Sequence, residues 1–363
     1  MTDFQTVSPT GRPRASGLGV VFDGETGPFN AITDVPGVEV GYRTLIEGQG
    51  CRTGVTVILP RGRTRELQPT WAGMQSFNGN GEMTGSHWVR EAGHFTGPIS
   101  ITNTNAIGAV HDGMLRWLVA NHPAEPGAPR WFLPIVAETW DGHLNDIEAF
   151  HVEPRHVAEA IAAASSGPVG EGNLGGGTGM RCYGFKGGSG TSSRKVPASA
   201  WTVGAFVQAN FGQRRELMVR GLPLGKRVDE MSPTAPSPTS GLGSIIVVLA
   251  TDAPLHSRQL DGLARRAIVG VARTGTTGHH GSGDIFLAFS TSPFARGPET
   301  RMEAPVADHQ LSSFFTCAAE AVEEAILNAL VGAETMTGYL GRRVEAIDHE
   351  VVRSACGSAA SEF

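Results

Sequence analysis

The sequence predicts an α/β protein built in layers, with sheets that are antiparallel or mixed. Short apolar or alternating runs, rich in β-branched residues and bounded by Gly, Pro or Asn, recur along the chain as strands do. Helical spacing of apolar residues is clear in only three longer segments. Because the strands group together and do not alternate strictly with helices, a doubly wound parallel sheet is disfavoured. No internal repeat is visible, so residues 1–363 are expected to form a single compact domain.

Six segments have the apolar pattern of strands: 54–59, 99–102, 131–136, 201–209, 244–249 and 284–289. Helices are expected where apolar residues recur every three or four positions: 107–118, 260–271 and 312–331. Residues 222–243 form a linker that becomes rich in Pro, Ser and Thr from residue 231. The apolar strand after it needs neighbours on both faces, so we interpret the linker as a processing loop within one fold and not as a domain boundary.

The composition is that of a globular chain and excludes several classes of protein. A hydrophobic content of 40% with 18% charged residues excludes disorder over most of the chain. The net charge of −6 and the lack of a basic stretch with interleaved aromatic residues argue against nucleic-acid binding. The cysteines have no C-x-x-C spacing and are expected to be free thiols, without a zinc site or disulfide framework: Cys51, Cys182, Cys317 and Cys356.

No targeting or membrane signal is recognised in the sequence. Residues 1–16 lack the apolar core of a signal peptide, and no stretch reaches the roughly 20 apolar residues of a membrane span. We therefore expect a cytoplasmic protein.

Glycine is frequent, with 49 residues, and it clusters in loops that could bring backbone amides to one site: 78–81, 175–179, 187–190 and 278–283. The loop at 175–179 lacks the G-K-[ST] ending of a phosphate-binding P-loop and its strand-then-helix context. The pair His279-His280 has no third ligand at a metal-binding spacing. We therefore predict no nucleotide, metal or other cofactor.

Ser244 carries the strongest functional signal. It follows Gly243 directly and opens the apolar run 244–249 after the linker. If the bond between the two residues is cut, Ser244 gains a free α-amine, which titrates at about 7.7–8 and can act as general base for the adjacent hydroxyl. The alternative is an ordinary Gly-Ser turn before a strand.

Further polar groups stand at strand ends. Ser282 and Asp284 are two residues apart, so they share a face and are expected to hydrogen-bond in line and to orient the hydroxyl and amine of Ser244. A turn capped by their side chains is the alternative. Asn210 closes the strand 201–209 and is either a turn residue or an amide donor to an oxyanion.

An acidic string follows the predicted strand 131–136. Glu138 is a candidate anchor for a substrate ammonium through a charge-assisted hydrogen bond, and Trp140 is a candidate wall of the same pocket. Asp141-Gly142 is equally typical of a turn, and Asn145-Asp146 of a helix N-cap.

Seven strings, in order between about residues 16 and 350, resemble the DmpA-type family of self-processing aminopeptidases (peptidase family P1), which includes L-aminopeptidase/D-amidases and β-peptidyl aminopeptidases. They are Ile32-Thr-Asp-Val-Pro-Gly37, Gly54-Val-Thr-Val-Ile-Leu-Pro60, Asn173-Leu-Gly-Gly-Gly-Thr-Gly-Met180, Phe185-Lys-Gly-Gly-Ser-Gly-Thr191, Val207-Gln-Ala-Asn210, Gly241-Leu-Gly-Ser244 and Gly281-Ser-Gly-Asp284.

The resemblance implies a four-layer αββα sandwich of the DmpA and ornithine acetyltransferase-like type, similar to N-terminal nucleophile hydrolases but with different strand connectivity. It also implies autocleavage between Gly243 and Ser244. The products would be an α-chain, residues 1–243, and a β-chain, residues 244–363, which stay associated, usually as a tetramer of such pairs.

The same resemblance implies roles for the residues above. Ser244 would be the nucleophile, supported by Ser282 and Asp284. Asn210 would donate to the oxyanion, and Glu138 would recognise the substrate amine.

The implied activity is the release of N-terminal amino acids from peptides, amides or esters, with α-L, α-D and β-amino acids all left open. Some members of the family have Glu in place of Asp284, and some have Tyr in place of Trp140. Two alternatives are an ornithine acetyltransferase-like acyltransferase, which uses a threonine nucleophile, and a non-catalytic metabolite-binding protein, which would remain uncut.

Overall fold

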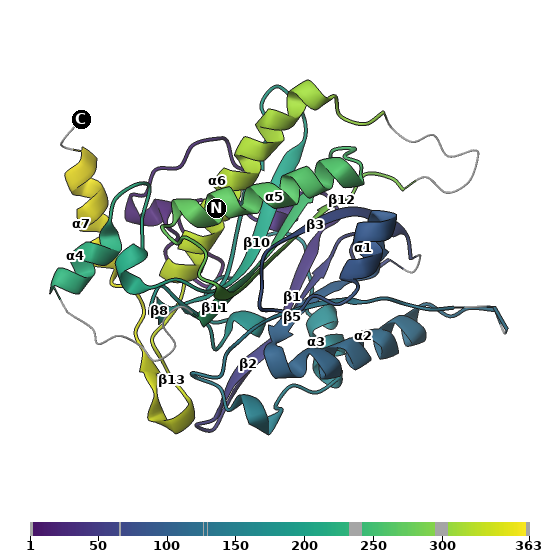
Figure 1. Ribbon diagram of the computed structural model, residues 1–363, viewed down its shortest axis with the longest axis horizontal. Helices are drawn as coiled ribbons and strands as arrows, with labels where there is room; N and C mark the ends of the chain where they lie inside the picture. The colour runs from purple at the N-terminus through teal and green to yellow at the C-terminus, as the bar shows by residue number, and fades with distance from the viewer. Residues whose placement is uncertain are drawn as a thin grey trace.

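Two β-sheets pack face to face, and helices cover the outer face of each, as the computed structural model shows (Figure 1). The structure describes residues 3–64, 67–125, 127–128, 130–231, 242–294 and 304–360. This is the expected αββα sandwich, and its sheets are mixed as the strand grouping predicted. Among the described residues, no helix has the length and apolar character needed to cross a membrane.

The smaller sheet has four strands, in the order β1 (Glu39–Glu47), β2 (Cys51–Leu59), β5 (Ile99–Asn103) and β6 (Ile135–Thr139). Only β5 and β6 run parallel within it. Its outer face is covered by α2 (Ile107–Asn121) and α3 (Arg155–Ala162), whose buried residues form one apolar cluster with those of the strands. The end of β6 is functionally important because the chain segment that follows it meets the larger sheet.

The larger sheet has six strands, in the order β4 (His94–Thr96), β3 (Pro69–Gly79), β12 (Gly281–Ser290), β11 (Leu242–Thr251), β10 (Thr202–Asn210) and β9 (Gly188–Lys195). The central pair, β11 and β12, is parallel, and the other pairs are antiparallel. Helices α5 (Ser257–Arg273) and α6 (Leu311–Val331) cover its outer face.

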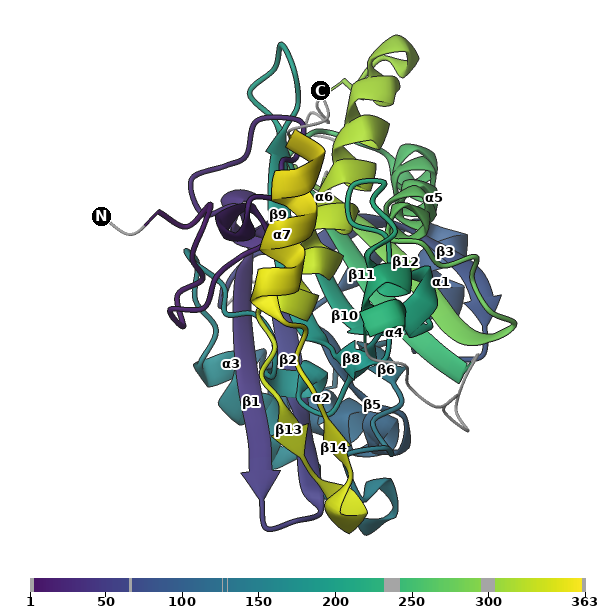
Figure 2. The same cartoon turned by 90° about the vertical axis from the view of Figure 1, so that its left-hand side faces the viewer.

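Shorter elements complete the chain: α1 (Ser86–Ala92), α4 (Leu224–Met231), α7 (His349–Ala360), β7 (Arg181–Cys182), β8 (Phe185–Lys186), β13 (Met336–Thr337) and β14 (Arg343–Val344). Figure 2 shows α7 and the β13–β14 hairpin on the side of the molecule that faces the viewer.

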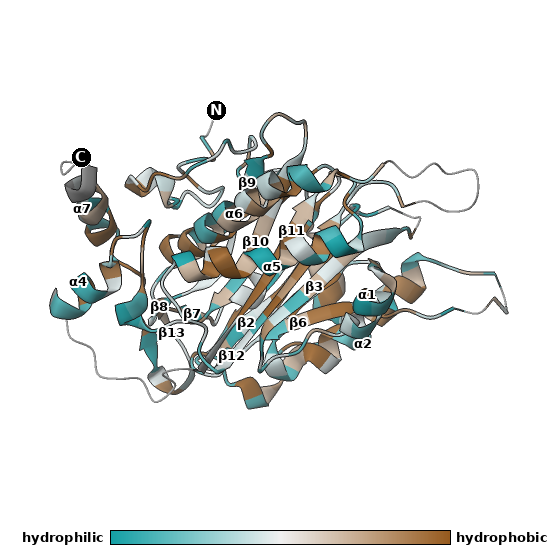
Figure 3. Cartoon of the chain, turned by 45° about the horizontal axis from the view of Figure 1, so that its top comes forward, coloured by the Kyte–Doolittle hydropathy of each residue, from teal (hydrophilic) through white to brown (hydrophobic). Residues whose placement is uncertain are grey.

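Strand β11 shows how the sequence builds the layers. Successive side chains of a strand point to opposite faces. Ile245 and Val247 pack with the helices, whereas Ile246 and Val248 pack between the two sheets. The apolar colouring of the central strands in Figure 3 reflects burial on both faces, and each such side chain contributes about 1.5–3 kcal/mol. By the same alternation, Ser244 lies on the face between the sheets.

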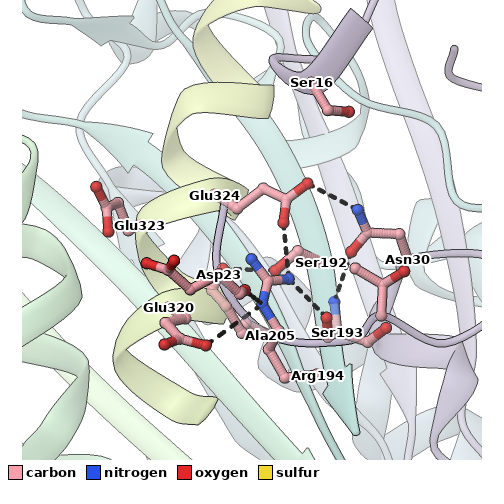
Figure 4. Close-up of polar contacts among 12 residues, drawn as sticks. Ser16, Asp23, Asn30, Ser192, Ser193, Arg194, Ala205, Glu320, Glu323 and Glu324 are labelled. Atoms are coloured by element: carbon pink, nitrogen blue, oxygen red, sulfur yellow. Dashed lines mark hydrogen bonds and ion pairs between the residues drawn. The ribbon is translucent and has the colours of Figure 1, made fainter. Parts of the chain in front are cut away.

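A buried charge network ties α6 to β9 and to the N-terminal segment (Figure 4). The guanidinium of Arg194 lies 2.7 Å from the carboxylate of Glu324 and 3.6 Å from that of Glu320. Asn30 donates a 2.7 Å hydrogen bond to Glu324 from the N-terminal side. Arg194 is near the end of β9 opposite to Gly188, which neighbours the functional end of β10. The network therefore supports the fold at a distance from the site described below.

Two sequence expectations need correction. The predicted strand 131–136 begins only at Ile135, because Trp131 is 73% exposed and Pro134 cannot donate to a strand ladder. The linker 222–243 contains helix α4, and β11 begins at Leu242, two residues before the predicted start. Residues 232–241, the centre of the predicted processing loop, lie outside the described residues.

Candidate active site

Ser244 is buried between the two sheets, with 3% of its surface exposed. Its hydroxyl oxygen faces two N–H donors. The backbone N–H of Trp140 lies 3.3 Å from Ser244 Oγ, and the side-chain amide Nδ2 of Asn210 lies 3.4 Å from it. One donor comes from the segment after β6 in the smaller sheet, and the other from the end of β10 in the larger sheet. Ser244 is thus the point where the two sheets converge on a hydroxyl.

Asn210 is held in a fixed orientation by two backbone groups. It pairs with Ser244 in the antiparallel register of β10 and β11. Its Nδ2 donates to the carbonyl oxygen of Trp140 at 2.9 Å, and its Oδ1 accepts from the backbone N–H of Arg181 at 2.9 Å. These bonds define which side of the amide is the donor side. The structure therefore places Asn210 next to Ser244, where the sequence analysis expected an oxyanion donor.

Ser282 and Asp284 form the expected hydrogen bond, with Ser282 Oγ donating to Asp284 Oδ1 at 2.6 Å. Ser282 pairs with Gly243 in the parallel register of β11 and β12. Gly243, Ser282 and Asp284 line one small pocket. Alternation along β12 places the pair on the helix-covered face with Phe286, not on the face of the Ser244 hydroxyl. The pair therefore adjoins the peptide bond before Ser244.

Asp284 is buried, and its second oxygen accepts a 2.8 Å hydrogen bond from Nδ2 of Asn78. Burial raises the pKa of Asp284 above its ordinary value, and the hydrogen bonds from Ser282 and Asn78 oppose this rise. The sequence analysis missed Asn78 as a partner, since β3 and β12 are far apart along the chain and only the sheet brings them together.

Glu138 lies in β6, two residues before Trp140, and is 3% exposed. Its carboxylate accepts a 3.1 Å hydrogen bond from the backbone N–H of Glu82 and a second from the hydroxyl of Thr104. Burial raises the pKa of Glu138, and these two hydrogen bonds oppose the rise. A buried carboxylate that accepts only from neutral donors is suited to bind a cation, such as a substrate ammonium.

Trp140 contributes to the site in a way that the sequence analysis did not identify. Its backbone N–H, and not its indole, faces Ser244 Oγ. The indole is 40% exposed and packs over Gly142, where a Cβ atom would approach the ring to 2.5 Å. The turn predicted at residues 141–142 is present, because Asp141 O accepts from the N–H of Asn145 at 3.1 Å. Asp146 stands at the N-cap of the short 3-10 helix Ile147–Ala149, as predicted, but without a capping hydrogen bond from its side chain. The Asn145 side chain bonds instead to Asp141 and to the backbone N–H of Arg52.

The glycine loop at 175–179 serves packing between the sheets. A Cβ atom at Gly176 would lie 2.2 Å from Gln208 Oε1 and 2.7 Å from the carbonyl oxygen of Ile101, so only glycine fits there. His279 Nε2 lies 2.8 Å from a carboxylate oxygen of Glu216 and thus has a structural partner. These contacts give Gly176 and His279 structural roles.

A buried serine with two converging N–H donors, set in an αββα frame, is an arrangement suited to hydrolysis of amide bonds. Residues 30–344 match the family model described as peptidase family S58. The chain belongs to this family and is a hydrolase of the aminopeptidase class.

Named relatives are similar over nearly the whole chain. The β-peptidyl aminopeptidase BapA of Sphingosinicella microcystinivorans is 47% identical, and the alignment covers 94% of this chain and 91% of BapA. The L-aminopeptidase D-Ala-esterase/amidase of Ochrobactrum anthropi, described as a variant of the Ntn hydrolase fold, is 46% identical with a TM-score of 0.89, covering 96% of this chain and 99% of that one. The β-aminopeptidase of a Burkholderia species is 47% identical with a TM-score of 0.86, covering 95% and 98%.

Proposed function

We propose that this chain is a self-processing serine aminopeptidase that releases an N-terminal amino acid from short peptides, amides or esters through an acyl-enzyme on Ser244. The observation that carries the proposal is the convergence of the Trp140 N–H and the Asn210 amide on Ser244 Oγ. The relatives are named for acting on β-peptides and on L- and D-amino acid derivatives. N-terminal β-amino acids are therefore the first substrates to test, followed by α-L and α-D residues.

Processing is the first reaction. Ser244 Oγ attacks the carbonyl carbon of Gly243, the C–N bond breaks, and the released amine of Ser244 takes up the proton that the hydroxyl loses. Water then hydrolyses the ester, which frees the carboxylate of Gly243 and restores the hydroxyl. The position of Ser282 and Asp284 beside this peptide bond supports a role in holding the new α-amine.

The two products would remain bound to each other. Strands β3, β4, β9 and β10 belong to the segment before the cut, and β12 belongs to the segment after it. The cut falls inside β11, so its first two residues, Leu242 and Gly243, precede the cut and the rest of the strand follows it. All six form one sheet, and β11 is hydrogen-bonded to β10 on one side and β12 on the other. Separation would break two β ladders, β10–β11 and β3–β12, and expose the apolar residues of both faces of β11, which is strongly unfavourable.

Turnover repeats the chemistry on a substrate. The free α-amine of Ser244, which titrates near neutral pH, takes the hydroxyl proton as Oγ attacks the substrate carbonyl. The Trp140 N–H and the Asn210 amide, which face Ser244 Oγ, lie beside the atom that becomes bonded to the substrate carbonyl carbon. In this proposal they stabilise the charge that develops on the carbonyl oxygen. The leaving amine departs with a proton, and water hydrolyses the acyl-enzyme in the same site.

Glu138 would select substrates with a free amine. Its carboxylate is desolvated and has neutral hydrogen-bond partners among the described residues, so an ammonium ion supplies the missing countercharge. Trp140, whose indole is partly exposed, would form a wall beside the bound amino acid.

Assembly and location remain predictions from the sequence. We propose a tetramer of αβ pairs in the cytoplasm, and sedimentation of the purified enzyme tests the assembly: a monomeric αβ pair at working concentrations would exclude it.

A panel of L-, D- and β-aminoacyl p-nitroanilides tests the activity. The wild type should release p-nitroaniline from at least one series but not from N-acetylated versions of the same compounds. Ser244→Ala should be inactive and should remain one chain of 38.1 kDa. Substantial turnover by Ser244→Ala, or equal turnover of acetylated compounds, would contradict the assignment of the nucleophile or of the amine site.

A further inference from the structure

Four basic residues gather on one side of Ser244, and the mechanism above uses none of their side chains. They are His143, Arg181, Arg214 and Arg342, which we call the basic rim. Three come from segments that adjoin the site: the loop after β6, the start of β7 and the stretch after β10. The fourth, Arg342, reaches the same loop from the hairpin region near the C-terminus.

The rim is tied to the oxyanion donors by direct contacts. The side chain of Asn210 joins the carbonyl of Trp140 to the backbone N–H of Arg181, each at 2.9 Å. Arg181 is therefore attached to the same amide that faces Ser244 Oγ. Arg342 donates to the carbonyl oxygens of Gly142 at 3.3 Å and His143 at 3.5 Å, within the loop that follows Trp140.

Arg214 and Arg342 are held by neutral groups. The guanidinium of Arg214 donates to the carbonyl oxygen of Gly184 at 3.2 Å and lies 4.3 Å from the centre of the Phe185 ring. That of Arg342 lies 5.8 Å from the centre of the Tyr339 ring. Among the described ion pairs, neither arginine has a carboxylate partner, although Asp229 acts on Arg214 from a longer distance.

The basic groups of the rim disfavour one another's charge. Burial lowers the pKa of His143 to about 4, and the charges of Arg181 and Arg342 act in the same direction. Burial also lowers the pKa of Arg181, and Arg214 adds to this effect. Arg214 and Arg342 have no carboxylate partner among the described ion pairs, so an anion that binds them would relieve this repulsion. Ionisable groups perturbed in this way are enriched at functional sites.

The rim and the amine site lie on opposite sides of the nucleophile. The carboxylate of Glu138 lies toward β12, because a Cβ atom on Gly81 would be 3.1 Å from Glu138 Oε1 and 3.3 Å from the Cα atom of Gly283. Arg181 lies next to Asn210 at the end of β10. Since β11 runs between β12 and β10, Ser244 stands between a site for a cation and a cluster of cations.

We infer that the basic rim binds the C-terminal carboxylate of the substrate, so that the enzyme prefers short free peptides, dipeptides above all, over peptides whose C-terminus is blocked. The inference deepens the proposed function and rests on it. The ammonium of the substrate would bind at Glu138, its scissile carbonyl at Ser244, and its carboxylate on the leaving-group side at Arg181, Arg214 and Arg342. Guanidinium groups bind carboxylates in a bidentate geometry, which makes them suitable for this recognition.

The test compares a β-alanyl dipeptide with its C-terminal amide, and each is assayed by kcat/KM at low and high ionic strength. The wild type should prefer the free acid by roughly tenfold or more, and salt should reduce this preference. Arg342→Gln, a change at an exposed residue, should lower the ratio by several-fold while hydrolysis of the amide persists. The matched control is Arg343→Gln, because the neighbouring Arg343 is already paired with Glu345 at 2.6 Å.

The possible results distinguish failure of the basic rim from failure of the proposed aminopeptidase activity. Equal kcat/KM for the acid and the amide in the wild type, with both hydrolysed, would overturn the basic rim and leave the aminopeptidase activity intact. Equal effects of the substitutions at Arg342 and Arg343 would overturn it as well. If the wild type cleaves neither dipeptide nor any aminoacyl p-nitroanilide, the proposed function fails, and the inference fails with it.

Discussion

Substitution of Asn210 by Ala tests the role of the only side-chain donor that the described residues direct at Ser244 Oγ. One of two converging donors would be lost, while the Trp140 N–H stays in place. Removal of one well-placed oxyanion donor reduces kcat by about 10²–10³-fold, or roughly 2.7–4 kcal/mol of transition-state stabilisation. We expect a loss of this size in kcat with a smaller change in KM, because the ground-state carbonyl carries less charge than the transition state.

The same substitution also affects stability, so a matched control is needed. Asn210→Ala removes the side-chain partner of the Trp140 carbonyl and the Arg181 N–H. Because both groups are only partly buried, the cost is about 1 kcal/mol for each, the lower end of the penalty for an unsatisfied group. Asn328 is also buried and makes the same kind of bonds, donating to Thr191 O at 3.1 Å and accepting from the Ala15 N–H at 3.0 Å. Asn328→Ala should therefore lower the unfolding temperature similarly.

The assay is steady-state hydrolysis of an aminoacyl p-nitroanilide by processed, folded enzyme, with the active fraction measured by titration. Asn328→Ala should retain most of its kcat per active site, whereas Asn210→Ala should not. Equal kcat values for the two variants, at similar thermal stability, would show that Asn210 serves only to hold the strand end, and would refute the reasoning.

Three further predictions concern buried carboxylates. Glu138→Gln should reduce kcat/KM for free-amine substrates by roughly 10–100-fold, the value of a charge-assisted hydrogen bond. Because burial raises the pKa of Glu138, the substitution should also remove an acidic limb from the pH profile of kcat/KM. A variant that binds these substrates normally would contradict the amine site. Burial raises the pKa of Asp141 to about 7, so between pH 4 and 7 the folded chain retains a proton that the unfolded chain loses, and the free energy of unfolding should fall as the pH rises through this window. In denaturant unfolding, Asp141→Asn should lose roughly 2–4 kcal/mol of this pH dependence. The same dependence of the unfolding free energy on pH in the variant and the wild type would exclude this role of Asp141. Glu324→Gln should destabilise the fold by roughly 3–5 kcal/mol because it removes the carboxylate closest to the buried guanidinium of Arg194. A change below 1 kcal/mol in the calorimetric free energy of unfolding would contradict the importance of this network.

Much of the site was predictable because its side chains stand at strand ends with simple periodicity. Ser282 and Asp284 are two residues apart on β12, and this spacing alone predicted their hydrogen bond. Asn210 and Ser244 end and begin two recognisable apolar strands, which the structure pairs in register. The layered fold followed from the grouping of strands, and the resemblance to a known family added the order of the layers.

The contacts that escaped prediction depend on backbone groups or on distant pairings. The Trp140 N–H has no sequence signature, because every residue except proline has a backbone N–H. The direction of this N–H is set by the turn after β6. Asn78 reaches Asp284 only because β3 and β12 are neighbours in the sheet. The basic rim was also not predicted, because Arg181, Arg214 and Arg342 are far apart in the sequence and only the fold brings them near one another.

The central claim, that Ser244 is an N-terminal nucleophile made by cutting the chain, is tested most directly by intact-mass spectrometry of the enzyme in its active state, before and after brief exposure to a slowly hydrolysed aminoacyl ester. The account predicts two chains, the smaller one beginning at Ser244, and an added acyl mass on that chain alone. A single chain of 38.1 kDa with full activity, or an acyl group on any residue other than Ser244, would contradict it.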